Sequence, residues 1–117
     1  MVRESPATFE AYEDLETARR VKFHTGTNKI EYADAAEDFI GVTINSGLEG
    51  EGVDIALKRA AGGTVEIELA GACSAGNTLY GAADGKVATS STGTDKYGIA
   101  VEDGSASGAI IESIIDD

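Results

Sequence analysis

Residues 64–103, TVEIELAGACSAGNTLYGAADGKVATSSTGTDKYGIAVED, decide the predicted fold class of this chain. Apolar residues alternate with polar or small residues in three segments of this stretch, 65–69, 86–89 and 97–101. A shorter apolar segment, 78–80, lies between the first and the second of them. Alternation places every second side chain on one face of a sheet, so each segment is expected to form a half-buried strand. Gly76-Asn77 and Asp84-Gly85 can supply the positive φ of tight hairpins. These features predict a small, strongly twisted antiparallel barrel or sandwich.

The rest of the chain extends the same pattern. A chain of 117 residues is long enough for one domain and too short for two ordinary ones. Its 15 glycines against one proline favour short strands and tight turns over helices. Further strands are expected at 20–24, 29–32, 39–44, 53–58 and 109–115, and a single helical turn at 33–38. About nine short strands at this spacing are typical of an all-β sandwich or barrel, here small and rich in Gly and Ala.

Residues 1–19 differ from everything that follows. Phe9, Tyr12 and Leu15 stand as isolated apolar residues in an acidic background, and their spacing supports at most one short helical face. Such a segment is either a frayed tail or an arm that becomes ordered when these three side chains dock on a neighbouring subunit. We therefore divide the chain into an N-terminal arm, 1–19, and a single β domain, 20–117.

The charge balance excludes one class of partner. The net charge is −12, with 7 basic and 12 acidic residues in 1–60 and 2 basic and 9 acidic residues in 61–117. A surface this acidic repels phosphate, which argues against binding to DNA or RNA. The same charge favours a partner with a basic surface.

The single cysteine and single histidine limit the chemistry. Cys73 lies among small residues, where a buried structural thiol is expected, and His24 is far from it in sequence, so no Cys-His pair is indicated. No apolar run is long enough for a membrane helix, and the N-terminus has no signal-peptide pattern, so we expect a protein made in the cytoplasm that does not enter a membrane.

Other candidate sites are weak. One histidine cannot build a His-rich metal site, and no Ser-His-Asp set is visible. Asp84, Asp95 and Asp103 are expected in turns, but their spacing matches no calcium loop. Lys96 follows an aspartate, as does the modified lysine of lipoyl carriers, but Tyr97 and not alanine comes next. We therefore expect no catalytic residue, no cofactor, no metal and no small-molecule substrate.

Three segments resemble the decoration (cement) proteins of tailed-bacteriophage capsids. They are residues 70–80 (AGACSAGNTLY), 84–87 (DGKV) and 97–104 (YGIAVEDG), followed by a closing apolar strand at 110–115. The resemblance covers about residues 63–115, whereas residues 1–62 match only in general character. It implies a non-enzymatic protein, often trimeric, that binds the outer surface of an assembled icosahedral shell and sends an N-terminal arm along it.

The resemblance leads to the following expected function. The protein would bind the major capsid protein on the virion surface, as a homotrimer, and stabilise the mature head. The arm would carry the docking residues, which are Phe9, Tyr12, Leu15, Arg19 and Arg20. The alternative is a carbohydrate- or host-surface-binding β module of a phage fibre or an adhesin.

Overall fold

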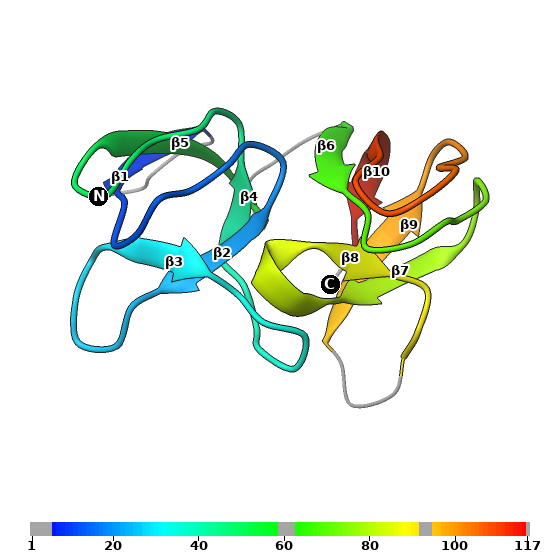
Figure 1. The fold of residues 1–117 in the computed structure, drawn as a ribbon, viewed down its shortest axis with the longest axis horizontal. Coiled ribbons are helices and arrows are strands. Elements are labelled where there is room, and N and C mark those ends of the chain that lie inside the picture. Colours follow the sequence, from blue (N-terminus) through cyan, green and yellow to red (C-terminus); the bar gives the residue numbers. More distant parts are fainter. Residues whose placement is uncertain (1–5, 59–62, 92–94, 117) are drawn as a thin grey trace.

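Ten strands form two antiparallel five-stranded sheets that lie side by side along the long axis of the molecule (Figure 1). The computed structural model describes residues 6–58, 63–91 and 95–116. We call residues 6–58 the first lobe and residues 63–116 the second lobe, each containing one sheet. The all-β, two-sheet prediction is confirmed.

The first lobe has the strand order β1-β5-β4-β2-β3. Its strands are β1 (Ala7–Glu10), β2 (Arg20–Phe23), β3 (Ile30–Tyr32), β4 (Gly41–Thr43) and β5 (Gly52–Leu57). Strands β2 and β3, both expected from the sequence, form an antiparallel hairpin with Val21 opposite Tyr32. The predicted helical turn at 33–38 is a connecting turn with no helix.

The second lobe repeats this arrangement, with the order β6-β10-β9-β7-β8. Its strands are β6 (Val65–Glu68), β7 (Thr78–Gly81), β8 (Val87–Ala88), β9 (Lys96–Ala100) and β10 (Ile110–Ile115), with a short 3-10 turn, η1 (Ala83–Gly85), between β7 and β8. Adding five to each strand number of the first sheet reproduces the second, so the two lobes have the same topology.

Hydrogen bonds outside the strands repeat as well. Leu15 and Gly47 exchange two backbone hydrogen bonds in the first lobe, and Cys73 and Gly104 exchange the same two in the second. The loop after β1 forms a parallel bridge to Ile30, and the loop after β6 forms one to Val87. The two lobes are therefore an internal structural repeat with one residue-to-residue correspondence.

A glycine stands at the same place in both repeats. Gly41 on β4 and Gly98 on β9 lie so close to the neighbouring strand that a Cβ would overlap the carbonyl oxygens of Ala56 and Ile114, respectively. Only glycine permits this approach. The shared glycine shows that both sheets have the same tight contact between their third and second strands in sheet order.

The core of the second lobe packs against one face of the first sheet, the face that carries Val42. Its buried side chains, including Ile67, Leu79 and Tyr97, form one cluster with Phe39 and Val42 of the first lobe. The first lobe has a separate core of its own, made of Ala11, Leu15, Val21, Ile30, Val53 and Ile55. The core of the second lobe thus extends across the contact between lobes, and this contact covers one face of the first sheet.

Arg20 is the polar centre of the contact between lobes. Its side chain is fully buried, and its guanidinium donates to the carbonyl oxygens of Ala33 at 3.0 Å within the first lobe and Ala82 at 3.0 Å in the second. Its Nε donates to the Lys86 carbonyl at 3.2 Å. Burial lowers the pKa of Arg20, and the nearby Asp95 carboxylate partly offsets this. Buried charges persist only when they are well hydrogen-bonded, and this one is satisfied mainly by backbone carbonyls.

The predicted arm belongs to the folded sheet. Strand β1 pairs along its whole length with β5, from Ala7 opposite Ile55 to Glu10 opposite Gly52. Residues 6–19 therefore form part of the first lobe, and residues 1–5 lie outside the described residues. The division at residue 19 was wrong because an acidic segment with few apolar residues can still be held by main-chain hydrogen bonds to a neighbouring strand.

Candidate interaction surfaces

Three of the five predicted docking residues are buried inside the protein. Leu15 is 2% exposed in the core of the first lobe, and Arg20 is fully buried. Arg19 is 7% exposed and donates to Glu68 Oε2 at 3.2 Å and to the Asp84 carbonyl at 3.0 Å, both in the second lobe. The prediction that Leu15, Arg19 and Arg20 contact a partner is corrected: the two arginines join the lobes, and Leu15 fills the core.

Of the other two predicted residues, Phe9 is half-buried against the core of the first lobe and Tyr12 is exposed, and both have aromatic neighbours that the sequence did not single out. The Phe9 ring packs edge-on against Phe23, with ring centroids 5.2 Å apart. Tyr12 stacks on His24 at 3.6 Å, and His24 Nδ1 lies 3.2 Å from a Glu31 carboxylate oxygen. Phe23 and His24 end the expected 20–24 strand, just before the short gap to the expected 29–32 strand, and that position at a strand end was the available signal for their exposure.

Tyr12 borders a strongly acidic surface, which we call the acidic loop end. It consists of the loops 12–16 and 46–51, which are held together by the Glu49 amide donating to Asp14 Oδ1 at 2.9 Å. Two large apolar side chains stand out from these loops, Tyr12 at 42% exposure and Leu48 at 62%. The same two loops carry five carboxylates, those of Glu13, Asp14, Glu16, Glu49 and Glu51. Exposed apolar side chains inside a charged rim are typical of a protein–protein contact.

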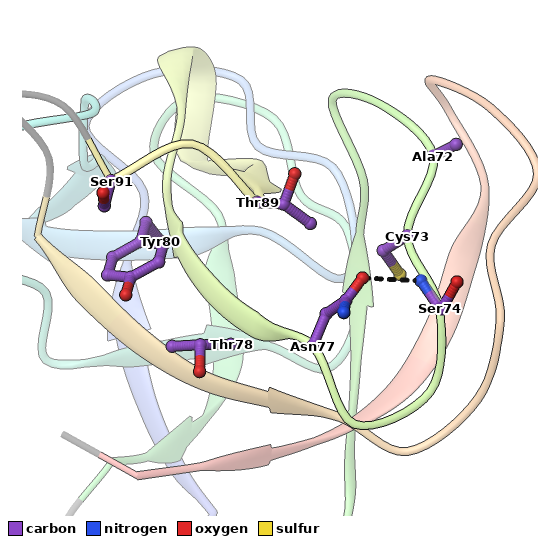
Figure 2. Close-up of a pocket in the computed structure, with 8 residues that line it drawn as sticks. All are labelled: Ala72, Cys73, Ser74, Asn77, Thr78, Tyr80, Thr89 and Ser91. Carbon is purple, nitrogen blue, oxygen red and sulfur yellow. Dashed lines mark hydrogen bonds between the residues drawn. The ribbon is translucent and has the colours of Figure 1, made fainter.

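The second lobe carries an open groove of about 600 Å³, shown in Figure 2. Hydroxyl and amide side chains make up most of its lining, together with one aromatic ring: Ser74, Asn77, Thr78, Tyr80, Thr89 and Ser91. Asn77 accepts a hydrogen bond from the Ser74 amide at 2.9 Å, which fixes one wall (Figure 2). None of the described residues that line this groove is charged, so it suits a neutral ligand or an uncharged side chain.

Cys73 lies at the back of this groove but is poorly suited to nucleophilic chemistry. It is 9% exposed, and burial raises the pKa of its thiol. A reactive cysteine needs a lowered pKa, because the thiolate is the nucleophile. Its structural role matches the prediction from its small-residue neighbours.

The remaining candidate sites gain no support. Among residues 6–58, 63–91 and 95–116, no group of three or more His, Cys, Asp or Glu side chains is placed to hold a metal ion. Lys96 begins strand β9, and its Nζ lies 3.6 Å from an Asp116 carboxylate oxygen. Within the described ranges, no helix is both long enough and apolar enough to cross a membrane.

Comparison with known proteins identifies a shared fold. No protein-family model matches the sequence, and no curated protein matches it significantly. The structure is similar to the solved structure of the head fiber gp8.5 N base in bacteriophage phi29, with a TM-score of 0.75 at 16% sequence identity. The match covers 95% of this chain and 92% of that chain. At this level of identity the similarity shows that the two chains have the same fold over nearly their whole lengths.

Proposed function

We propose that this protein is a structural component of a phage head that binds the outer surface of the assembled capsid and stabilises it without catalysis. The similarity to the phi29 head fiber base supports this proposal most, because it spans nearly all of both chains. The resemblance of residues 63–115 to capsid decoration proteins points the same way. A protein that binds only the assembled shell stabilises that shell by mass action.

The acidic loop end is the best candidate for the capsid contact. Leu48 is the most exposed large apolar side chain among the described residues, and Tyr12 lies on the adjacent loop. Apolar anchors supply most of the free energy of a contact, whereas a charged rim sets orientation and partner choice. The partner surface on the major capsid protein would therefore be basic, with a pocket for each anchor.

The expected homotrimer fits this role on physical grounds. Three copies held together present three acidic loop ends, and once one end binds, the others bind at a high effective concentration. The protein would be made in the host cytoplasm and act on the virion surface.

Co-sedimentation with empty expanded capsids tests the proposal. The wild-type protein should pellet with capsids, and Leu48→Glu should raise the apparent Kd at least about tenfold, the effect of losing about 1.4 kcal/mol. Binding should also weaken with rising salt, because the acidic rim is exposed. Val101→Glu is the matched control, since Val101 is a 44% exposed apolar residue on the other lobe.

The outcomes separate the role from the surface. A wild-type protein that stays in the supernatant at all salt concentrations overturns the proposed function. If Leu48→Glu decorates capsids to full occupancy, the role stands but the acidic loop end is not the docking surface.

A second candidate function is glycan binding by a fibre module. The uncharged groove with its hydroxyl groups and the Tyr80 ring favours it, because sugars bind to such surfaces through hydrogen bonds and stacking on an aromatic ring. Retention of the protein on a glycan matrix, lost in Tyr80→Ala, would support this function in place of capsid decoration.

A further inference from the structure

The internal repeat shows that the second lobe exposes a sheet face whose counterpart is covered. In the first sheet, Arg20 lies opposite Val42, and Val42 lies opposite Ala56. These three residues form a row across β2, β4 and β5 on the face that packs against the second lobe. Arg20 and Val42 are fully buried, and Ala56 is 7% exposed.

The corresponding row in the second sheet is Thr78, Ile99 and Ile114. Thr78 lies opposite Ile99, and Ile99 lies opposite Ile114, in the same register as the first row. Here Ile114 is 44% exposed, and Ile99 and Thr78 are half-buried. The row adjoins the groove, which Thr78 also lines. We call this row and the groove the open face.

The first row is covered by one end of the second lobe, made of β6, the β7–η1–β8 hairpin and the start of β9. Small residues let this end approach closely. A Cβ on Gly81 would lie 2.7 Å from an Arg20 guanidinium nitrogen, and one on Gly85 would lie 2.5 Å from the Arg20 carbonyl oxygen. The contact therefore matches a large side chain on the sheet face with glycines on the hairpin.

The same end of the first lobe is exposed. The His24 amide bonds to the Lys29 carbonyl as the Ala82 amide bonds to the Lys86 carbonyl, so the 24–29 hairpin corresponds to the 82–86 hairpin. The counterpart of Gly81 is Phe23, which is 40% exposed. We call β1, Phe23 and the 24–29 hairpin the outer end. Tyr12 stacks on His24 at the border of this end, and its own counterpart, Ala70, is exposed.

We propose that the open face binds the outer end of a second copy of this chain, with Phe23 entering the groove beside Thr78. The side-chain sizes are exchanged relative to the contact within the chain: Arg20 meets a glycine there, whereas Thr78 would meet a phenylalanine here. A second copy is the proposed partner because the open face and the outer end occupy the same places in their lobes as the two surfaces that meet within the chain.

A contact between two different surfaces has a defined consequence for assembly. Such heterologous contacts close into a ring or continue as a filament, unlike a twofold contact, which stops at a dimer. A ring of three copies would be the trimer that the family resemblance implies. The acidic loop end borders the outer end, because Tyr12 stacks on His24, but its most exposed anchor, Leu48, belongs to neither the open face nor the outer end.

Two variants test the contact from its two sides. Phe23→Glu should disable the outer end and leave the open face intact. Thr78→Arg should fill the groove as Arg20 fills its counterpart, and leave the outer end intact. In analytical ultracentrifugation at concentrations up to about 1 mM, the wild type should self-associate, and each variant alone should be monomeric. An equimolar mixture of the two should form a heterodimer, because one intact surface of each kind remains.

Three results would overturn the proposal: a monomeric wild type over this range, a wild-type assembly that both variants retain, or variants that stay monomeric when mixed. Circular dichroism and thermal unfolding of each variant check that the fold is kept. Leu48→Glu serves as the matched control, because it removes an exposed apolar side chain outside both surfaces. It should assemble like the wild type even if it fails to bind capsids, so the two proposals fail independently.

Discussion

The two lobes share the same strand order and the same hydrogen-bonding pattern. They differ in the side chains on the sheet face that, in the first lobe, contacts the second lobe. In the first lobe this face carries Arg20 and Val42, and the second lobe buries both side chains. The second lobe places Thr78 and Ile99 there, and they stay accessible. The difference shows that the repeated backbone tolerates either a buried or an open face, and that a few side chains decide which one forms.

The cores of the lobes differ in the same way. Ile55 lies in the apolar core of the first lobe, and Ile40 is half-buried against that core. At the corresponding places in the second lobe, the Tyr97 hydroxyl donates to Ser113 Oγ at 2.7 Å, and Ser113 donates to the Val65 carbonyl at 2.7 Å. A polar chain thus replaces two aliphatic side chains, and burial raises the pKa of Tyr97 well above its usual value.

The shared glycine gives the largest expected effect. Gly98→Ala should destabilise the protein by more than about 4 kcal/mol, because the new methyl would overlap the backbone of β10. Gly41→Ala should act through the same contact in the first lobe. Urea unfolding measures both. If either variant has wild-type stability, the proposed equivalence of the two tight contacts is wrong.

The buried arginine should come next. Arg20→Met removes the donor shared by several buried carbonyls, and we expect a loss of about 3 kcal/mol. Thr78→Met is the matched change in the second lobe, and because Thr78 is half-exposed, it should shift stability by about 0.5 kcal/mol or less. Equal losses at the two positions would contradict the distinction between a covered and an open face.

Tyr97 should show both a moderate loss and a pH effect. Tyr97→Phe should cost about 1 kcal/mol at neutral pH, because Ser113 loses a donor. The folded state disfavours the ionised ring, whereas the unfolded chain ionises near pH 10. The stabilisation is therefore fully present below about pH 10 and is lost as pH rises above it, by up to about 1.4 kcal/mol per pH unit.

Unfolding measured between pH 8 and pH 11 separates these contributions. The decline above pH 10 should be shallower in Tyr97→Phe than in the wild type. The double variant Tyr97→Phe/Ser113→Ala should lose less than the sum of the two single variants, because the pair acts as one chain. Parallel pH curves would show that Tyr97 does not contribute to alkaline unfolding.

The smallest effect concerns a left-handed position. Gly76 has a φ of +90°, and its counterpart, Ala18, has a φ of +60° despite its side chain. Gly76→Ala should cost about 1 kcal/mol, because it adds strain and the new methyl would find no neighbour within 4 Å. A gain in stability at Gly76 would show that this turn does not hold the same conformation in the two lobes.

Much of the local structure was predictable from residue patterns. The residue patterns located nine of the ten strands in the described part of the chain to within two residues at each end, and the turns at Gly76-Asn77 and Asp84-Gly85 were recognised. Strand β1 was missed because Ala7–Glu10 has only one large apolar side chain. The groove could not be predicted, because its walls come from loops and strands separated in sequence, such as Asn77 and Ser91.

Strand pairing could not be read from the sequence either. Gly76-Asn77 was expected to form a tight hairpin, but the strands on its two sides, β6 and β7, are not neighbours in the sheet, and the partner of β6 is β10. Alternation reports that a strand has one buried face and says nothing about which strand lies beside it. The repeat was hidden for the same reason, since matching positions such as Arg20 and Thr78 share a backbone place without sharing chemistry.

By itself, the sequence determined the all-β class, the places of most strands and turns, and the acidic surface, because these follow from local periodicity, turn chemistry and composition. Only the tertiary structure decided that Arg19 and Arg20 are internal, that β1 is part of a sheet, and that two matching lobes leave one face open. These depend on contacts between residues far apart in the chain, where burial is set by what packs against a side chain and not by the side chain's own polarity.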